Sequence, residues 1–167
     1  LNLLKALSLI KSKKIDFLCF LVGSNINQNN FRLVSEIKKL KLSKYVKLIG
    51  QNDNILKFMN GFDIYVQSSS YGEGFPNVVA ESMSCGTPCI VTDVGDASYI
   101  VDKNGWVIPP NDEVNLARSI ESAYAQFGSK KWIRRSKDAR MRIRRKFNIK
   151  KMISSYNKLW VRCMSEN

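Results

Sequence analysis

The apolar residues of this chain follow two kinds of pattern, which alternate over the first 110 residues. Short continuous apolar runs are typical of strands buried on both faces, and apolar residues recurring every three or four positions are typical of helices. The predicted strands are Ile15–Val22, Tyr45–Ile49, Asp63–Gln67, Cys89–Thr92 and Trp106–Ile108. The predicted helices are Asn2–Lys11, Phe31–Leu42, Asn54–Asn60, Asn77–Cys85, Val114–Phe127, Lys130–Lys146 and Ile149–Cys163.

This alternation predicts an α/β fold, in which a doubly wound, Rossmann-like parallel sheet is covered by helices on both faces and closed by carboxyl-terminal helices. The length suits one domain, and we expect residues 1–167 to form it. Ligands of such sheets bind where the strands end, so the loops after the strands are the candidate site. These loops are Gly23–Asn25, Gly50–Asn54, Ser68–Asn77 and Asp93–Ala97.

Composition excludes several kinds of chemistry. The chain has no histidine, which removes Ser-His and Cys-His catalysis and histidine metal sites. Its four cysteines lack the spacing of metal ligands, so we expect reduced thiols, no bound metal and a cytoplasmic protein. No apolar run approaches the ~20 residues that cross a bilayer.

The positive charge is concentrated near the carboxyl terminus. Residues 129–167 contain 14 basic and 2 acidic residues, a net charge of +12, whereas the first 128 residues carry +1. The basic stretch Lys130–Lys146 is consistent with a solvated helix face, with peripheral contact to an anionic membrane, or with contact to nucleic acid. No nucleic-acid-binding motif accompanies the charge, so we expect no nucleic-acid partner.

The most informative segment is the predicted loop and helix from Ser68 to Pro88. The loop contains Gly72 and Gly74, and the free amides at the start of the following helix form a site for an anion such as a diphosphate. Glu73 and Glu81 are eight residues apart, and a carboxylate accepts hydrogen bonds well from a vicinal diol. The pattern therefore suggests a nucleotide sugar, although the spacing alone also fits a solvated acidic pair.

The sequence EGFPNVVAE at residues 73–81, followed by SMSCGTP, resembles the E-x7-E motif of retaining glycosyltransferase family 4, the group 1 transferases. Further resemblance lies upstream in VKLIG (46–50) and FDIYVQS (62–68), and downstream in IVTDVG (90–95) and GWVIPP (105–110). It covers nearly the whole chain, in order. It implies the carboxyl-terminal, donor-binding half of the two-domain GT-B fold.

The resemblance also implies roles for individual residues. Glu73 would be the catalytic residue, holding hydroxyls of the donor sugar near its anomeric carbon, and Glu81 would bind the ribose hydroxyls. The residues between them would line the sugar and the diphosphate: Gly74, Phe75, Pro76, Asn77, Val78 and Val79. Two earlier loops would contact the base or mark the first turn of the domain: Gly50, Gln51, Asn52 and Gly23.

For the whole enzyme, the resemblance implies sugar transfer with retention from a UDP, GDP or ADP sugar to a glycan or lipid-linked acceptor. The setting would be surface polysaccharide biosynthesis, in the cytoplasm or at the inner face of the membrane, with no metal or other cofactor. An acceptor-binding domain and an Arg–Lys pair that neutralises the diphosphate are expected before Leu1, and the helix within 147–167 is expected to cross to that domain. Alone, the chain is expected to bind donor weakly and to transfer nothing.

Two other functions remain open from the sequence. A non-catalytic nucleotide-binding module would keep the anion site at the helix start but would not require both glutamates. A GT-B nucleotide-sugar epimerase would share the fold and would normally use a histidine-bearing or acidic cleft. This chain has both glutamates and no histidine, which favours the transferase.

Overall fold

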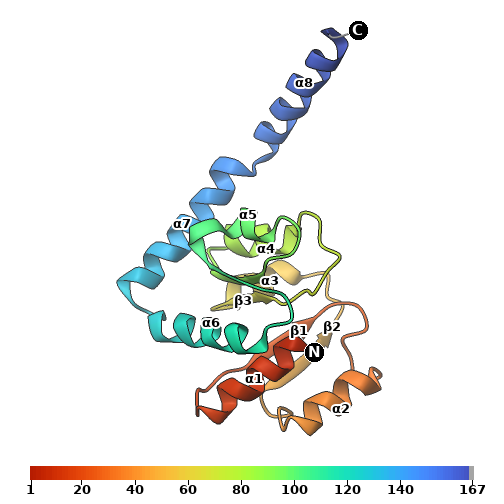
Figure 1. The fold of residues 1–167 in the computed structure, drawn as a ribbon, viewed down its shortest axis with the longest axis vertical. Helices are drawn as coiled ribbons and strands as arrows, with labels where there is room; N and C mark the ends of the chain where they lie inside the picture. Colours follow the sequence, from red (N-terminus) through yellow and green to blue (C-terminus); the bar gives the residue numbers. More distant parts are fainter. Residues whose placement is uncertain (166–167) are drawn as a thin grey trace.

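The structure, a computed structural model, describes residues 1–165, so the last two residues of the predicted domain lie outside the described part (Figure 1). The helices are α1 (Asn2–Ser12), α2 (Phe31–Lys39), α3 (Ile55–Gly61), α4 (Asn77–Ser84), α5 (Ala97–Val101), α6 (Glu113–Gln126), α7 (Lys130–Lys146) and α8 (Ile149–Ser165), with a 3-10 turn at Asp102–Asn104. The strands are β1 (Cys19–Val22), β2 (Val46–Gly50), β3 (Tyr65–Gln67), β4 (Cys89–Thr92) and β5 (Trp106–Ile108).

All the strand pairs of the described residues are parallel, and the strands divide between two sheets. β1 pairs with β2 in one sheet, and the order in the other is β3-β4-β5. The central strand, β4, is fully buried, and its residues alternate between two cores. Ile90 packs with α1 and α6, whereas Cys89 and Val91 pack with α4, α5 and α7. The predicted α/β fold, with parallel strands and helices on both faces, is confirmed.

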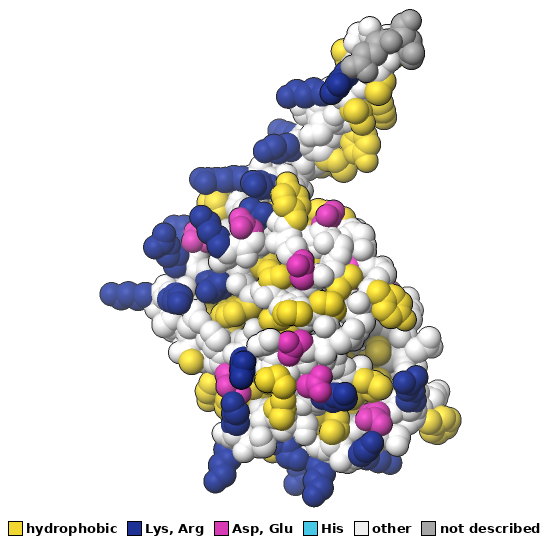
Figure 2. Space-filling model, viewed as in Figure 1, with side chains coloured by type: hydrophobic (Ala, Val, Ile, Leu, Met, Phe, Trp, Pro, Cys, Tyr) yellow, Lys and Arg dark blue, Asp and Glu magenta, His cyan; other side chains and the backbone are white. Residues whose placement is uncertain are grey.

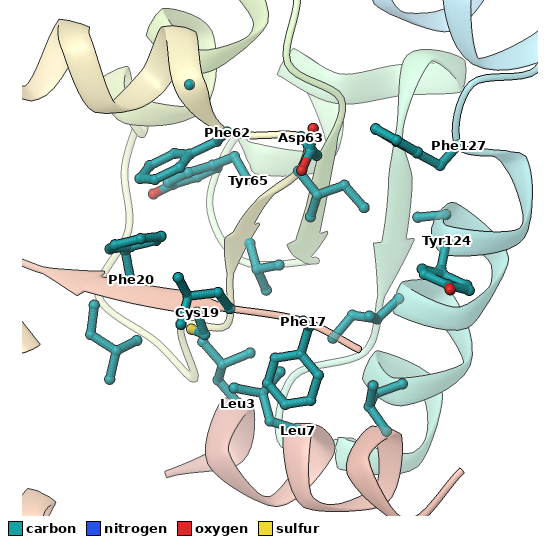
Figure 3. Close-up of a pocket in the computed structure, with 18 of the residues that line it drawn as sticks. Leu3, Leu7, Phe17, Cys19, Phe20, Phe62, Asp63, Tyr65, Tyr124 and Phe127 are labelled. Atoms are coloured by element: carbon teal, nitrogen blue, oxygen red, sulfur yellow. The ribbon is translucent and has the colours of Figure 1, made fainter. Parts of the chain in front are cut away.

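The first strand differs from its prediction. The apolar pattern predicts a strand from Ile15 to Val22 buried on both faces, but pairing begins at Cys19, opposite Val46, and both Leu18 (52%) and Phe20 (37%) are exposed. The reason is that β1 has a neighbouring strand on one edge only. Its other edge faces a cavity of about 540 Å³, which separates it from residues 61–66 (Figure 3).

The helix α5 is not predicted from the sequence. It has five residues, which is little more than one turn, so it carries no repeated apolar spacing. Its Ala97, Ile100 and Val101 side chains are nevertheless buried against β4. The core that forms when the chain folds, rather than any local pattern, gives this segment its helical form.

Two arginines of the basic helix α7 bind carbonyl groups at the ends of other helices. Arg140 donates from Nε to the Ser84 carbonyl at 3.0 Å and from Nη2 to the Cys85 carbonyl at 2.6 Å, at the carboxyl end of α4. Arg135 donates to the carbonyls of Lys103 (3.3 Å) and Gly105 (3.2 Å). Cations at helix ends satisfy unpaired carbonyls and oppose the negative end of the helix dipole.

A third arginine, Arg142, does the same at α5. Its Nε donates to the Ile100 carbonyl at 2.7 Å, its Nη2 donates to the Tyr99 carbonyl, and its Nη1 lies 3.0 Å from Oδ2 of Asp102. Its side chain is only 9% exposed. Part of the basic stretch therefore holds the domain together, which none of the three interpretations from the sequence predicts.

The last helix, α8, leaves the body of the domain, and none of its residues is buried (Figure 1). One side of it is apolar and the other carries basic side chains (Figure 2). Within residues 1–165, no helix is long and apolar enough to cross a membrane.

Candidate functional site

The loop between β3 and α4 holds Glu73 in a defined position. The Ser69 hydroxyl donates to Oε1 of Glu73 at 2.6 Å, and Glu73 is half-buried. The Thr92 hydroxyl, at the end of β4, donates to the Ser69 carbonyl at 2.7 Å. The carboxyl end of the central strand thus fixes the loop, and the loop orients the carboxylate.

The loop after β4 packs directly on the backbone of Glu73 and Gly74. The Asp96 amide donates to the Gly74 carbonyl at 2.8 Å. Gly95 adopts a φ of +57°, and a Cβ at this position would lie 2.3 Å from the Glu73 carbonyl oxygen. Only glycine allows so close an approach. The loops 68–77 and 93–97, both candidates from the sequence, therefore form one edge of the site.

Helix α4 begins at Asn77, as predicted, with Pro76 before it and no side-chain cap. The amides of Asn77 and Val78 are the first of the helix, and the Val79 amide donates to the Pro76 carbonyl at 3.0 Å. Uncapped amides at a helix start attract an anion. Glu81 lies one turn after Asn77, and both side chains are exposed on the same face of the helix. The arrangement offers an anion site at the helix start, with Glu73 in the preceding loop and Glu81 one turn into the helix.

Tyr65, on β3, lies near both glutamates, and the sequence analysis does not single it out. Burial raises the pKa of its phenol, and the nearby charges of Cys89, Glu73 and Glu81 raise it further. No local pattern marks Tyr65, because it is one aromatic residue in an apolar strand. Asn111 is also missed, although it accepts a hydrogen bond from the Ser70 hydroxyl at 2.5 Å.

The predicted residues of the first two loops form a second group. The Gly23 amide donates to the Gly50 carbonyl at 2.9 Å, and both glycines have positive φ. The Ser24 hydroxyl lies 3.4 Å from Oε1 of Gln51, and Asn52 accepts from the amide of Asn54 at 2.8 Å. These contacts bring together the ends of β1 and β2. The group belongs to the two-stranded sheet, whereas Glu73 is fixed by the three-stranded one.

The side chains of two predicted site residues, Val79 and Val78, lie in the core and along the cavity respectively. The Val79 side chain is fully buried in the core between α4 and β4, and its amide is engaged by Pro76. Val78 lines the cavity between the sheets. Any contact of Val78 with a ligand at the helix start would therefore be through its amide, whereas Val79 supports the site by packing.

The cavity between the two sheets touches this constellation at Val78 and Tyr65. Apolar side chains from α1, from β1 and the residues before it, and from the segment before β3 line it, among them Leu3, Leu7, Phe17 and Phe62 (Figure 3). Neither Glu73 nor Glu81 lines it. Burial raises the pKa of the Cys19 thiol in its wall to about 12, so this cysteine remains protonated at neutral pH. Its walls offer no polar cluster that would hold phosphates.

Comparison with known proteins gives the family. The model of the family described as glycosyl transferases group 1 matches residues 1–139. The chain belongs to this family. This agrees with the resemblance carried by residues 73–81, which lie inside the matched region.

Individual relatives support the same assignment. The Escherichia coli UDP-Gal:alpha-D-GlcNAc-diphosphoundecaprenol alpha-1,3-galactosyltransferase is 28% identical over 125 residues, covering 73% of this chain and 31% of the relative. A glycosyltransferase structure from Rickettsia africae ESF-5 superposes with a TM-score of 0.88 at 25% identity, covering 99% of this chain and 44% of that one. The structure of HepE from Anabaena in complex with UDP-glucose superposes at 0.79, with 22% identity and the same coverage.

The family member described here corresponds to part of these relatives. It spans between 10% and 31% of the length of the curated relatives it matches, and 44% of the two structures. The structural likeness confirms that the fold is the one found in GT-B glycosyltransferases.

Proposed function

We propose that this chain is the nucleotide-sugar-binding part of a retaining glycosyltransferase of family 4. The observation that supports it most is the uncapped start of α4, with Glu73 before it and Glu81 after it, in a chain of the group 1 family. A nucleotide-binding module without catalysis would need the helix start alone. The hydrogen bond that orients Glu73 favours the transferase, because it prepares a carboxylate beyond the phosphate position.

In this proposal each part of the donor meets a different group. The diphosphate lies at the amides of Asn77 and Val78, the ribose hydroxyls bind Glu81, and the sugar hydroxyls bind Glu73. As the sugar leaves, negative charge develops on the diphosphate, and fixed amides that face it stabilise that charge without a metal. Gly50, Gln51 and Asn52 approach the base, and Gly23 forms the first strand-to-loop turn of the domain. The fold shared with HepE, seen in complex with UDP-glucose, makes UDP the first carrier to test.

The acceptor would come from another domain of the whole protein. The printed name of the Escherichia coli relative describes a lipid-linked acceptor, which favours a glycan or lipid-linked acceptor in surface polysaccharide biosynthesis here. We expect α8 to place its apolar side on that other domain. The exposed basic residues of α7 and α8 would contact the inner face of the membrane from the cytoplasm, because anionic lipid attracts such groups.

Calorimetric titration tests the donor assignment. The chain is titrated with UDP, GDP and ADP, each bare and as its glucose conjugate. We expect one nucleotide series to bind, and weakly, with Kd values of roughly 0.1–1 mM, because the proposed contacts to the diphosphate are neutral backbone amides. Absence of any binding up to about 10 mM, well above that range, would reject the donor site.

The two glutamates are expected to have different effects. Glu73→Gln should weaken the binding of the UDP-sugar roughly 10-fold and leave the affinity for bare UDP nearly unchanged. The reason is that only the sugar loses a charge-assisted hydrogen bond. Glu81→Gln should weaken the binding of UDP and of the UDP-sugar alike, since both ligands contain the ribose. Asp138→Asn, on the exposed face of α7, is the control for loss of one negative charge. Equal losses for both ligands in both glutamate variants would contradict this division.

A further inference from the structure

Phe75, in the loop before α4, contacts an aromatic side chain from a distant part of the chain. Its ring centroid lies 5.5 Å from that of Phe147, the residue that ends α7. Tyr99 of α5 meets the same ring edge-on, with centroids 5.6 Å apart and an interplanar angle of 88°. Offset and edge-to-face ring pairs are favourable beyond the area that they bury. Phe147 therefore bridges the loop that carries Glu73 and the helix that follows β4.

Phe147 makes further contacts besides the one with Phe75. Its amide donates to the Ile143 carbonyl at 2.9 Å, and the Arg142 guanidinium lies 5.7 Å from its ring centroid. The ring also packs against the buried cluster that contains Val79 and Met83 of α4. A ring fixed in this way restricts where the Phe75 ring can lie, and so restricts the backbone of the adjacent Gly74.

The loop is thus constrained on two sides. The Asp96 amide holds the Gly74 carbonyl, and Phe147 holds the side chain of the next residue, Phe75. Phe75 is 41% exposed, so burial alone does not fix it. Within residues 1–165, Phe147 is the aromatic side chain that the Phe75 ring contacts.

We propose that Phe147 is a positioning residue for this loop: its ring fixes Phe75 and thereby the backbone of Glu73 and Gly74. Its effect on donor binding rests on the proposed function, whereas its effect on loop position does not. Phe147 lies outside the segment 1–139 that the family model matches, so this role is not part of the family resemblance. It acts through Phe75 and touches no reacting group.

The first test measures the position of the loop without any ligand. The NMR signals compared are the backbone N–H residual dipolar couplings of Gly74 and Phe75, which report bond orientation and do not depend on ring currents, in the wild type, Phe147→Leu and Phe147→Tyr. Leucine keeps an apolar side chain on the core and removes the ring, whereas tyrosine keeps the ring. The matched control is Phe127→Leu, because Phe127 ends α6 as Phe147 ends α7, and its ring lies 5.3 Å from that of Trp132.

We expect the Gly74 and Phe75 couplings to change in Phe147→Leu and to stay the same in Phe147→Tyr and Phe127→Leu. Unchanged couplings in a folded Phe147→Leu would overturn the proposal. Phe75→Leu removes the same ring pair from the exposed side, and it gives a second route if Phe147→Leu fails to fold. The Gly74 coupling should then change in the same way, and an unchanged coupling would again overturn the proposal.

The second test measures donor affinity by calorimetry. Phe147→Leu should weaken the binding of UDP-glucose by roughly 3- to 10-fold, the range expected for loss of one aromatic pair. The binding of bare UDP should be weakened less. Phe147→Tyr should restore both affinities. Equal weakening of both ligands in Phe147→Leu and Phe127→Leu would indicate a general structural effect and overturn the role in positioning the donor loop. Changed Gly74 couplings with no UDP-glucose binding in the wild type would refute the proposed function and leave the contact established.

Discussion

Gly95→Ala is expected to destabilise the domain by roughly 3 kcal/mol and to abolish nucleotide-sugar binding. Two effects combine at this position. An alanine at φ +57° is strained, and its Cβ would lie 2.3 Å from the Glu73 carbonyl oxygen and 2.4 Å from that of Gly74. Both contacts are to backbone, which cannot move aside as a flexible side chain can. The loop must therefore shift, and the Glu73 carboxylate shifts with it.

Urea unfolding of Gly95→Ala and of Gly128→Ala separates the two effects. Gly128 also has a positive φ, +72°, but no atom lies within 4 Å of a Cβ there. In Gly128→Ala the free energy of unfolding should fall only by the cost of backbone strain, about 1 kcal/mol, and ligand binding should be kept. Similar losses of stability in the two variants would show that the Glu73 backbone does not lie against Gly95.

Arg142→Met is the second change with a large expected effect, a loss of roughly 3 kcal/mol that lowers the Tm by about 10 °C. The substitution keeps the length of the side chain but removes the donors to the Tyr99 and Ile100 carbonyls. The ion pair with Asp102 contributes less, since Asp102 is half exposed and solvent screens it. Most of the loss comes from two carbonyls that are left without a strong donor.

Arg145→Met is the matched control, because Arg145 is on the same helix and is exposed. It should change the Tm by less than about 2 °C, as is usual for exposed positions. Thermal unfolding followed by circular dichroism compares the two. An equal, small change in both variants would mean that the arginines of α7 form only a solvated basic face.

The sequence predicts some elements to the residue and others poorly, for a physical reason. The strand Cys89–Thr92 lies in the middle of its sheet, so its apolar residues reflect burial on both faces. The segment Ile15–Val22 is equally apolar, but β1 has a strand on one edge and a cavity on the other. A local pattern reports how apolar a segment is, and does not report how many neighbours it will have. The five-residue α5 is too short to carry a pattern.

The same limit applies to the site. The spacing of Glu73 and Glu81 and the helix start at Asn77 could be predicted, because they lie in one local segment. The contacts that hold Glu73, from Ser69, Thr92 and the loop at Gly95, join segments that are distant in sequence. The arginines of α7 look alike in the sequence, and only the packing of α7 against α4 and α5 distinguishes those that bind carbonyls.

A crystal structure of the chain with UDP tests the central claim most directly. The account predicts that the diphosphate accepts hydrogen bonds from the amides of Asn77 and Val78 at the start of α4, with the ribose hydroxyls on the Glu81 carboxylate. A UDP bound elsewhere, in the cavity between the sheets or on the basic surface of α7, would contradict it.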